Sequence, residues 1–309
     1  MNFTTFDPAT AVIDSISSST GLPVYHPGTG VVIKNTFNDK TFDTRREDKQ
    51  YTYFVIADAE FTLKSDSLKP YFATGSVTRT DTLAKWGVVK DLITDTLYPA
   101  AASLPAVFVS KFGIPLPFAN SVITDTKKLS NGVVYILSLS GTTTASKFRE
   151  SLVQGESPSG FLSDKTSNTN YRLRLNPVTN QYYSDILVSG HGVSGYYAFY
   201  RLNEMPSMKY NVYALAVNDF QTANVFQSIG VQYFTPPATY TPVTTVPAAL
   251  NHAVPLKATA GAFTEVLLGT FTTTSFGTID MRLISGGATL GSAGTAPITL
   301  DYLRIVPVP

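Results

Sequence analysis

Residues 50–56 form an almost unbroken run of aromatic and β-branched side chains, a pattern that predicts a strand buried on both faces. Asp58 follows at once. Its carboxylate is placed to accept hydrogen bonds from the free N–H groups at the start of a short helix that includes Phe61 and Leu63. The chain therefore predicts a strand that leads directly into a capped helix.

A second helix is predicted over residues 81–93, because Trp86, Val89 and Leu92 recur at helical spacing and form one apolar stripe. Pro99 lies beyond it, and proline cannot continue a helix. Further strands are predicted over residues 106–109, 122–123 and 133–137. The first half of the chain thus mixes α and β structure.

The second half of the chain has no helical pattern beyond a short one near residues 147–149. It contains many short strand patterns with turn signals between them, which favours an all-β sandwich or jelly roll. The predicted strands cover residues 171–175, 185–189, 196–202, 209–217, 228–234, 264–273, 278–285 and 298–306. Within them Tyr196, Tyr200, Tyr210 and Tyr302 are interpreted as core residues.

The length of 309 residues suits about two domains. The small polar segment at residues 140–146 supplies the boundary, which gives domains of residues 1–140 and 141–309. The Pro-, Thr- and Ala-rich segment at residues 235–254 is interpreted as a long surface loop of the second domain.

Composition excludes several classes of protein. The net charge is +1 and charged residues make up only 15%, which argues against nucleic-acid binding. The densest basic run, residues 44–49, carries its own acids and is interpreted as a solvated loop. There is no cysteine, no apolar run long enough to span a bilayer and no signal peptide at the start of this chain.

Catalytic motifs are absent from the sequence. No Gly-x-Ser-x-Gly elbow occurs, and Ser189 and His191 lie too close together to serve as a nucleophile and its base. The three histidines are far apart and lack zinc-site spacing. A glycosidase needs only two carboxylates across a cleft, so that class stays open.

The turn at Asn131 and Gly132 feeds an apolar strand, and both residues tolerate the backbone angles of a tight reversal. This stretch, residues 129–138, resembles the last segment of the fasciclin-like domain. The strand and capped helix at residues 53–61, the helix at residues 88–93 and the stretch at residues 114–123 resemble other parts of that family. The resemblance implies an α+β fasciclin-like N-terminal domain.

Parts of the first half depart from the fasciclin pattern. Ile56 stands where the family usually has proline, and the first 45 residues match poorly. The Tyr-His pair linked to adhesion in animal members has no counterpart beside the central helix. Tyr25 and His26 lie elsewhere in the chain, so no adhesion role is assigned to them.

The second half resembles a galactose-binding-type jelly roll of the kind found in carbohydrate-binding modules. The resemblance rests on the paired strand patterns at residues 195–202 and 208–213 and on the closing stretch at residues 298–307. It implies glycan binding, with calcium as a recurrent ion of such jelly rolls. Asp185 and Asp219 are the calcium candidates, although no calcium-loop pattern is present. No other cofactor is predicted.

Sugar rings stack on aromatic faces, so the candidate carbohydrate-binding residues are tyrosines at the edges of loops. They are Tyr182, Tyr183, Tyr233 and Tyr240. Tyrosine is also a common half-buried strand residue, and core or edge packing is the competing interpretation for each.

These patterns predict a non-catalytic bacterial cell-surface protein for adhesion or polysaccharide binding, with a glycan or a surface protein as partner. The resemblance implies an exported, outer-membrane lipoprotein whose acylated cysteine would precede residue 1. One alternative is a structural subunit of a surface or outer-membrane uptake complex, or a virion component. A weak glycosidase or lyase is a third hypothesis.

Overall fold

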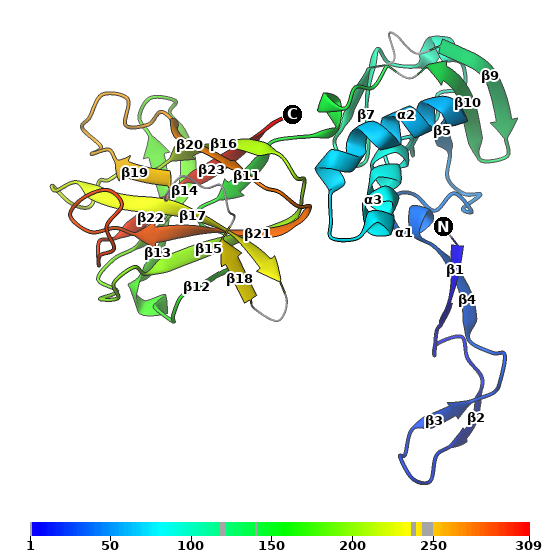
Figure 1. Cartoon of the computed structure of the whole chain (residues 1–309), viewed down its shortest axis with the longest axis horizontal. Helices are drawn as coiled ribbons and strands as arrows, with labels where there is room; N and C mark the ends of the chain where they lie inside the picture. The colour runs from blue at the N-terminus through cyan, green and yellow to red at the C-terminus, as the bar shows by residue number, and fades with distance from the viewer. Residues whose placement is uncertain (1, 118–121, 140, 236–238, 243–249) are drawn as a thin grey trace. The chain divides into compact units, whose positions relative to one another are not determined.

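The computed structural model describes residues 2–117, 122–139, 141–235, 239–242 and 250–309 (Figure 1). The chain forms two compact units. Unit 1 comprises Met1–Lys64 and Lys85–Ser146, and unit 2 comprises Ser65–Ala84 and Lys147–Pro309. Strands hold 44% of the residues and helices 15%, so the protein is mainly β. The boundary between residues 140 and 141 stays a prediction.

Unit 1 is built on a four-stranded sheet in which β10 runs parallel to β5 and antiparallel to β9. The strand order is β6 (Ile93–Thr94), β5 (Tyr51–Ile56), β10 (Gly132–Leu139) and β9 (Val122–Leu129). Phe54 and Tyr135 are fully buried and stack with their ring centroids 6.0 Å apart. The strand predicted over residues 50–56 is therefore confirmed. Unit 1 also contains β7 (Val107–Val109), β8 (Pro115–Pro117), α1 (Thr36–Lys40), η2 (Ala101–Ser103) and η3 (Ala145–Lys147).

The two longer helices are α2 (Asp58–Leu68) and α3 (Val77–Val89), with the 3₁₀ turn η1 (Lys69–Phe72) between them. Asp58 is the first helical residue of α2, one position inside the predicted cap. There its carboxylate lies in the first turn, where the helix dipole favours negative charge. The prediction of a helix over residues 81–93 was wrong at its C-terminal end. Ile93 belongs to β6, because it pairs with Tyr53 of β5.

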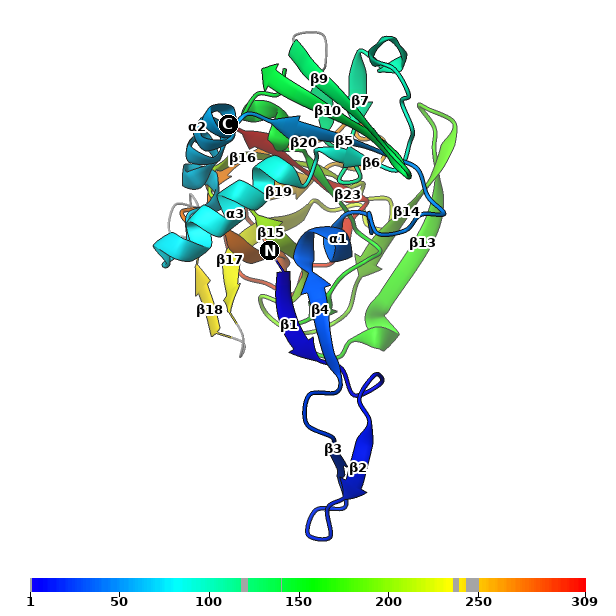
Figure 2. The ribbon, with the colours of Figure 1, turned by 90° about the vertical axis from the view of Figure 1, so that its right-hand side faces the viewer.

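An extended two-stranded ribbon, made of two successive strand pairs, forms the first part of unit 1 (Figure 2). Strand β1 (Asn2–Phe6) pairs with β4 (Val31–Asn35), and β2 (Ile13–Ile16) pairs with β3 (Pro23–Tyr25). The exposed apolar side chains of the ribbon are Phe6, Val12, Ile13, Ile16, Leu22, Val24 and Val31. A two-stranded ribbon has little stability of its own in water. The sequence patterns predicted none of these strands.

The described strands of unit 2 form three antiparallel sheets (Figure 1). The four-stranded sheet has the order β11 (Ser151–Gln154), β23 (Tyr302–Val308), β16 (Lys209–Leu215) and β20 (Val266–Thr272). The six-stranded sheet has the order β12 (Gly160–Phe161), β15 (Tyr197–Met205), β21 (Gly277–Ser285), β17 (Val225–Thr235) and β18 (Thr239–Pro242), with β19 (Leu250–Val254) also on β17. The three-stranded sheet has the order β13 (Thr169–Asn176), β14 (Gln181–Val188) and β22 (Ile298–Leu300), and η4 (Thr166–Asn168) precedes β13.

One hydrophobic core joins the sheets of unit 2. Val212 of the four-stranded sheet, Met281 of the six-stranded sheet and Ile186 of the three-stranded sheet are all fully buried in it. Tyr196, Tyr200 and Tyr210 are buried there as predicted, whereas Tyr302 is only half-buried. The Tyr302 hydroxyl instead donates to Glu265. The β-sandwich prediction for the second half is confirmed, and the fasciclin-like identity of the first half stays a prediction.

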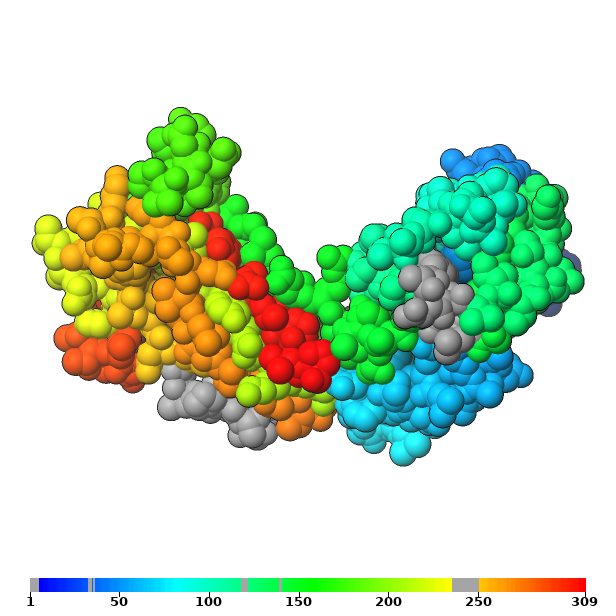
Figure 3. Space-filling view, turned by 90° about the horizontal axis from the view of Figure 1, so that it is seen from above, coloured from blue at the N-terminus to red at the C-terminus, as the bar shows by residue number. Residues whose placement is uncertain are grey.

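The β13–β14 hairpin extends beyond the body of unit 2, and it is the green projection in Figure 3. Its base joins β22 only through Ile186, Leu187 and Val188. The outer part of the hairpin is consequently not covered by β22.

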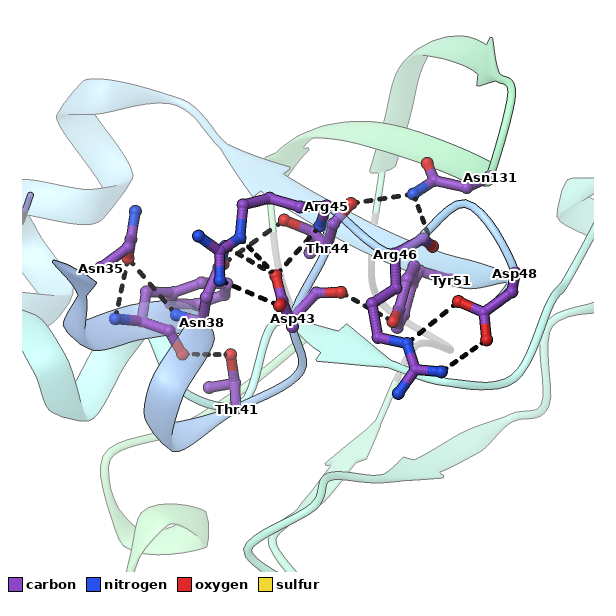
Figure 4. A network of polar contacts seen from close by, with 11 residues as sticks. Asn35, Asn38, Thr41, Asp43, Thr44, Arg45, Arg46, Asp48, Tyr51 and Asn131 are labelled. Carbon is purple, nitrogen blue, oxygen red and sulfur yellow. Dashed lines mark hydrogen bonds and ion pairs between the residues drawn. The ribbon is translucent and has the colours of Figure 1, made fainter. Parts of the chain in front are cut away.

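The Asn131–Gly132 turn holds the loop that precedes β5 (Figure 4). The Asn131 side-chain amide donates to the carbonyl oxygens of Thr44 and Arg46, at 2.8 and 3.3 Å. The backbone N–H of Tyr51 donates to the Asn131 carbonyl oxygen at 2.9 Å. A Cβ atom on residue 132 would lie 2.1 Å from the Tyr51 carbonyl oxygen, so this close approach of two strands requires glycine.

The basic run at residues 44–49 is neutralised locally, as predicted for a solvated loop. Arg45 binds the Asp43 carboxylate and Arg46 binds the Asp48 carboxylate, each through two of its nitrogens. These ion pairs are largely exposed, and pairs of this kind contribute little stability. The loop therefore offers no concentrated positive surface.

Candidate functional site

The predicted carbohydrate-binding tyrosines lie on two different sheets. Tyr182 and Tyr183 are neighbours on β14 and point to opposite faces of the hairpin. Tyr182 is 71% exposed. The Tyr183 ring lies under the Arg174 guanidinium and meets the edge of Phe263. Burial raises the pKa of the Tyr183 hydroxyl to about 12, and this oxygen has no hydrogen-bond partner among the described residues.

Tyr233 and Tyr240 belong to the six-stranded sheet. The Tyr233 hydroxyl accepts hydrogen bonds from the backbone N–H groups of Thr274 and Ser275, at 2.7 and 3.1 Å, so its polar end fixes a loop. Its ring packs against the core. Tyr240 lies on β18 in register with Phe234 of β17, and its side chain falls outside the described ones. The structure does not bring the four tyrosines into one cluster.

The two predicted calcium ligands, Asp185 and Asp219, face arginines. Arg172 donates to both oxygens of the buried Asp185 carboxylate, at 2.8 and 2.6 Å, and reaches Asp219 at 3.2 Å. Arg174 bridges the same two carboxylates, at 3.0 and 2.6 Å. The described residues include no cluster of three or more side chains suited to a metal ion. Calcium binding at this pair stays a prediction.

Asp301 is a buried carboxyl near this ion-pair cluster, and it bears on the hypothesis of a glycosidase. Burial, with the negative charges of Asp185 and Glu156, raises the pKa of Asp301 to about 7. The neighbouring hollow of about 570 Å³ is lined by residues 219–223 and does not include Asp301. A raised pKa suits a general acid, but a glycosidase also needs a second carboxylate across a substrate cleft, so a weak glycosidase stays a hypothesis.

A different set of aromatic and polar side chains lies on the outer face of the six-stranded sheet. Along β15 the buried Ala198 and Tyr200 alternate with half-buried side chains that point away from the core. Strands β21 and β17 continue this outer face through the cross-strand register. We call this set the aromatic–arginine face, and it consists of Tyr197, Phe199, Arg201, Gln232, Phe234, Asp280 and Arg282.

Arg201 lies at the centre of the aromatic–arginine face. Its guanidinium donates to both oxygens of the fully buried Asp280 carboxylate, at 2.8 and 2.9 Å. The same guanidinium lies 3.5 Å from the ring centroid of Phe234 and 5.4 Å from that of Phe199. A bidentate ion pair between two rings fixes the plane of the guanidinium. This part of the face is therefore preorganised.

The rest of the face repeats the combination of ring and polar group. The Arg282 guanidinium lies 4.4 Å from the ring centroid of Tyr197. Gln232 is in register with Asp280, and its side-chain oxygen Oε1 is buried without a donor among the described residues. A buried amide oxygen that accepts no hydrogen bond destabilises the folded protein.

Sequence reasoning missed the aromatic–arginine face, although a signal was present. The run from Tyr196 to Arg201 is aromatic on both strand faces, and alternation sends only one of those faces into the core. The cross-strand partners Asp280 and Gln232 are far away in the sequence. Their register with Arg201 follows only from the fold.

No protein-family model matches the chain, and no curated protein matches its sequence. Solved structures do match. The β-(1,4)-mannanase of Podospora anserina, which has GH26 and CBM35 modules, matches at 9% identity over 52% of this chain and 28% of that chain, with a TM-score of 0.33. A family 35 carbohydrate-binding module from Clostridium thermocellum matches at 16% identity over 52% of this chain and 100% of that chain, with a TM-score of 0.30.

The insecticidal crystal protein Cry2Aa also matches, at 11% identity over 52% of this chain and 22% of that chain, with a TM-score of 0.31. This chain thus spans less than a third of the length of the mannanase and of Cry2Aa. TM-scores below 0.5 establish neither a shared fold nor a shared function. None of the described helices is long and apolar enough to cross a membrane.

Proposed function

We propose that the protein binds polysaccharide without catalysis, and that the aromatic–arginine face of unit 2 is its binding surface. The observation that carries the proposal is the Arg201 guanidinium, which Asp280 holds 3.5 Å from the ring centroid of Phe234 and 5.4 Å from that of Phe199. Aromatic rings offer apolar faces to the C–H groups of a sugar ring, and guanidinium and amide groups bind its hydroxyls.

The placement of these groups on strands supports binding. Side chains on a sheet are held more precisely than side chains on loops, and a preordered surface loses less entropy when a ligand binds. None of these features requires a catalytic group, so the proposal is a binding protein.

Retention in native gels that contain a soluble polysaccharide would test this function with the full chain. We expect Phe234→Ala to weaken binding about tenfold through the loss of one stacking surface. Tyr182→Ala is the matched control, because Tyr182 is an exposed aromatic residue on another sheet. Thermal melting of both variants would show that each is folded.

The outcomes separate the candidate sites. Loss of retention in Phe234→Ala alone supports the aromatic–arginine face. Loss in Tyr182→Ala alone would move the site to the β13–β14 hairpin, where the sequence predicted it. Unchanged retention in both variants, or no retention of the folded wild-type protein by any plant or bacterial polysaccharide, would contradict the proposal.

For unit 1 we propose a fasciclin-like docking or structural module. Its support is the strand β5 that leads directly into α2, together with the Asn131–Gly132 turn that feeds the buried strand β10. A glycan-binding role fits an exported protein held at the bacterial cell surface. Fractionation of the source cells would test that location.

A second candidate function is that of an interaction subunit in a surface complex or a virion. The exposed apolar side chains of the N-terminal ribbon favour it, since exposed apolar surface of this extent marks contact sites. Deletion of residues 2–35 should then abolish incorporation into the native complex and leave polysaccharide retention unchanged. A chain that lacks the ribbon and still assembles would rule this candidate out.

A further inference from the structure

Strand β13 forms an open edge of the three-stranded sheet. It pairs with β14 on one side, and no described strand pairs with it on the other. An open edge presents a row of free backbone donors and acceptors to any second strand. Proteins usually block such edges with proline, charged side chains, above all lysine, a bulge or a very short strand. Strand β13 is eight residues long, has neither proline nor lysine, and pairs without a bulge.

The two faces of the hairpin differ in chemistry. On one face Tyr171, Leu173 and Leu175 of β13 line up with Tyr182 of β14, because directly opposite residues share a face. Tyr171 is 58% exposed, Leu173 72% and Leu175 46%. The other face carries Arg172 and Arg174. We call the four apolar side chains the hairpin strip.

The sequence of β13 is nearly symmetric about Leu173. Residues 170–176 read Asn, Tyr, Arg, Leu, Arg, Leu, Asn. An antiparallel copy centred on Leu173 would place Asn170 opposite Asn176, Tyr171 opposite Leu175, and Leu173 opposite itself. Every apolar residue then meets an apolar residue on the same face. A two-fold axis requires this self-complementarity.

We infer that β13 pairs with β13 of a second copy of this chain, antiparallel and in register about Leu173, and so joins two three-stranded sheets into one of six strands. The arginines do not oppose this pairing, although Arg172 would face Arg174 of the other copy. Both already bind Asp185 and Asp219, so the four charges of each copy sum to zero.

The size of the hairpin strip sets the expected strength of the dimer. At the exposures given, its four side chains expose roughly 400 Å² per copy, and pairing at the edge covers only part of this area because they stay on an open face of the joined sheet. A standard stable interface buries about 800 Å² per partner. The backbone hydrogen bonds of the paired edges add to the strip. We therefore expect a dimer that dissociates on dilution.

Sedimentation velocity of the full chain over a range of concentrations tests the dimer. The wild-type protein should pass from monomer to dimer as its concentration rises. Leu173→Lys should raise the dimer dissociation constant at least about a hundredfold, because two leucines leave the axis and two like charges replace them. Leu63→Lys is the control, since Leu63 is equally exposed, at 71%, and lies on α2.

A disulfide tests the register. The chain has no cysteine, so Leu173→Cys introduces a single thiol. The proposed axis places this thiol opposite its own copy, within reach of a disulfide. Leu175→Cys lies on the same face of the same strand, but its copy would be about 13 Å further along, too far to bridge.

Mild oxidation should therefore yield a covalent dimer with Leu173→Cys and little with Leu175→Cys. A wild-type chain that stays monomeric at every concentration would overturn the inference. So would a Leu173→Lys variant that dimerises as the wild type does. Equal cross-linking of the two cysteine variants would refute the register about Leu173. Each result is independent of polysaccharide binding.

Discussion

His252 should make the protein sensitive to acid. Its imidazole is buried on β19, with Nδ1 3.3 Å from the Gln227 amide nitrogen. The backbone of Thr299 fixes the orientation of the Gln227 amide. The Thr299 N–H donates to Gln227 Oε1, and the Thr299 carbonyl oxygen accepts from Gln227 Nε2. The Gln227 nitrogen therefore donates to Nδ1, and His252 is neutral. A proton on Nδ1 would break this contact inside the core.

The magnitude follows from the pKa. Burial lowers the pKa of His252 from 6.5 to about 4. Each unit of difference between the folded and unfolded states corresponds to about 1.4 kcal/mol. Protonation of His252 therefore lowers the free energy of unfolding by about 3 kcal/mol. This stability is complete above about pH 6.5 and is lost as the pH falls toward about 4, because the unfolded chain binds the proton first.

Urea unfolding of wild-type protein and of His252→Asn across this pH range would measure the effect. The variant should be less stable than the wild type at neutral pH, through lost packing, and its stability should fall less steeply with acid. Between about pH 6.5 and 4 the wild type should lose about 3 kcal/mol more stability than the variant loses. Parallel curves would refute the reasoning, because they would show that His252 does not titrate in the unfolding transition.

Three further predictions concern single sites. Asp301→Asn should stabilise the protein above about pH 7 and lose this advantage as the pH falls toward 3.8, because burial raises the pKa of Asp301 and penalises its charged form. Unfolding measured across this pH range tests the prediction, and a variant less stable than the wild type at about pH 8 would contradict it. Gly132→Ala should destabilise unit 1 by about 1–3 kcal/mol, because its Cβ would overlap the Tyr51 carbonyl oxygen; an unchanged melting temperature would contradict this. Calcium should leave the melting temperature unchanged, because guanidinium groups already bind Asp185 and Asp219; a rise that Asp219→Asn abolishes would instead establish the predicted calcium site.

The strands of unit 2 were predictable because their signal is local. Residues 278–285 were predicted as a strand and β21 spans Gly277–Ser285, since alternation with the core is visible within the segment itself. The last predicted strand, residues 298–306, proved to be two strands. Asp301 separates β22 from β23, and its backbone N–H donates to the Leu215 carbonyl oxygen of another strand.

The candidate site was less predictable because it depends on contacts between distant segments. The register between strands decides whether Tyr182 or Phe234 faces a neighbouring polar group. The pattern of residues within one strand does not show how that strand is aligned with its neighbours. The N-terminal ribbon escaped prediction for another reason. Its strands, such as β2, have both faces exposed, so burial imposes no alternation on them.

The pairing of β11 with β23 has a consequence for the synthesis of the protein. Ser151 of β11 pairs with Ile305 of β23, so the first strand of the sandwich has no partner until β23 has been made. Strand β16 meets both β20 and β23, and it too lacks one neighbour until then. Contacts so distant in sequence slow folding. The sandwich is therefore expected to close only after β23 has left the ribosome, and the loss of β23 would leave β11 without a partner and β16 with β20 alone.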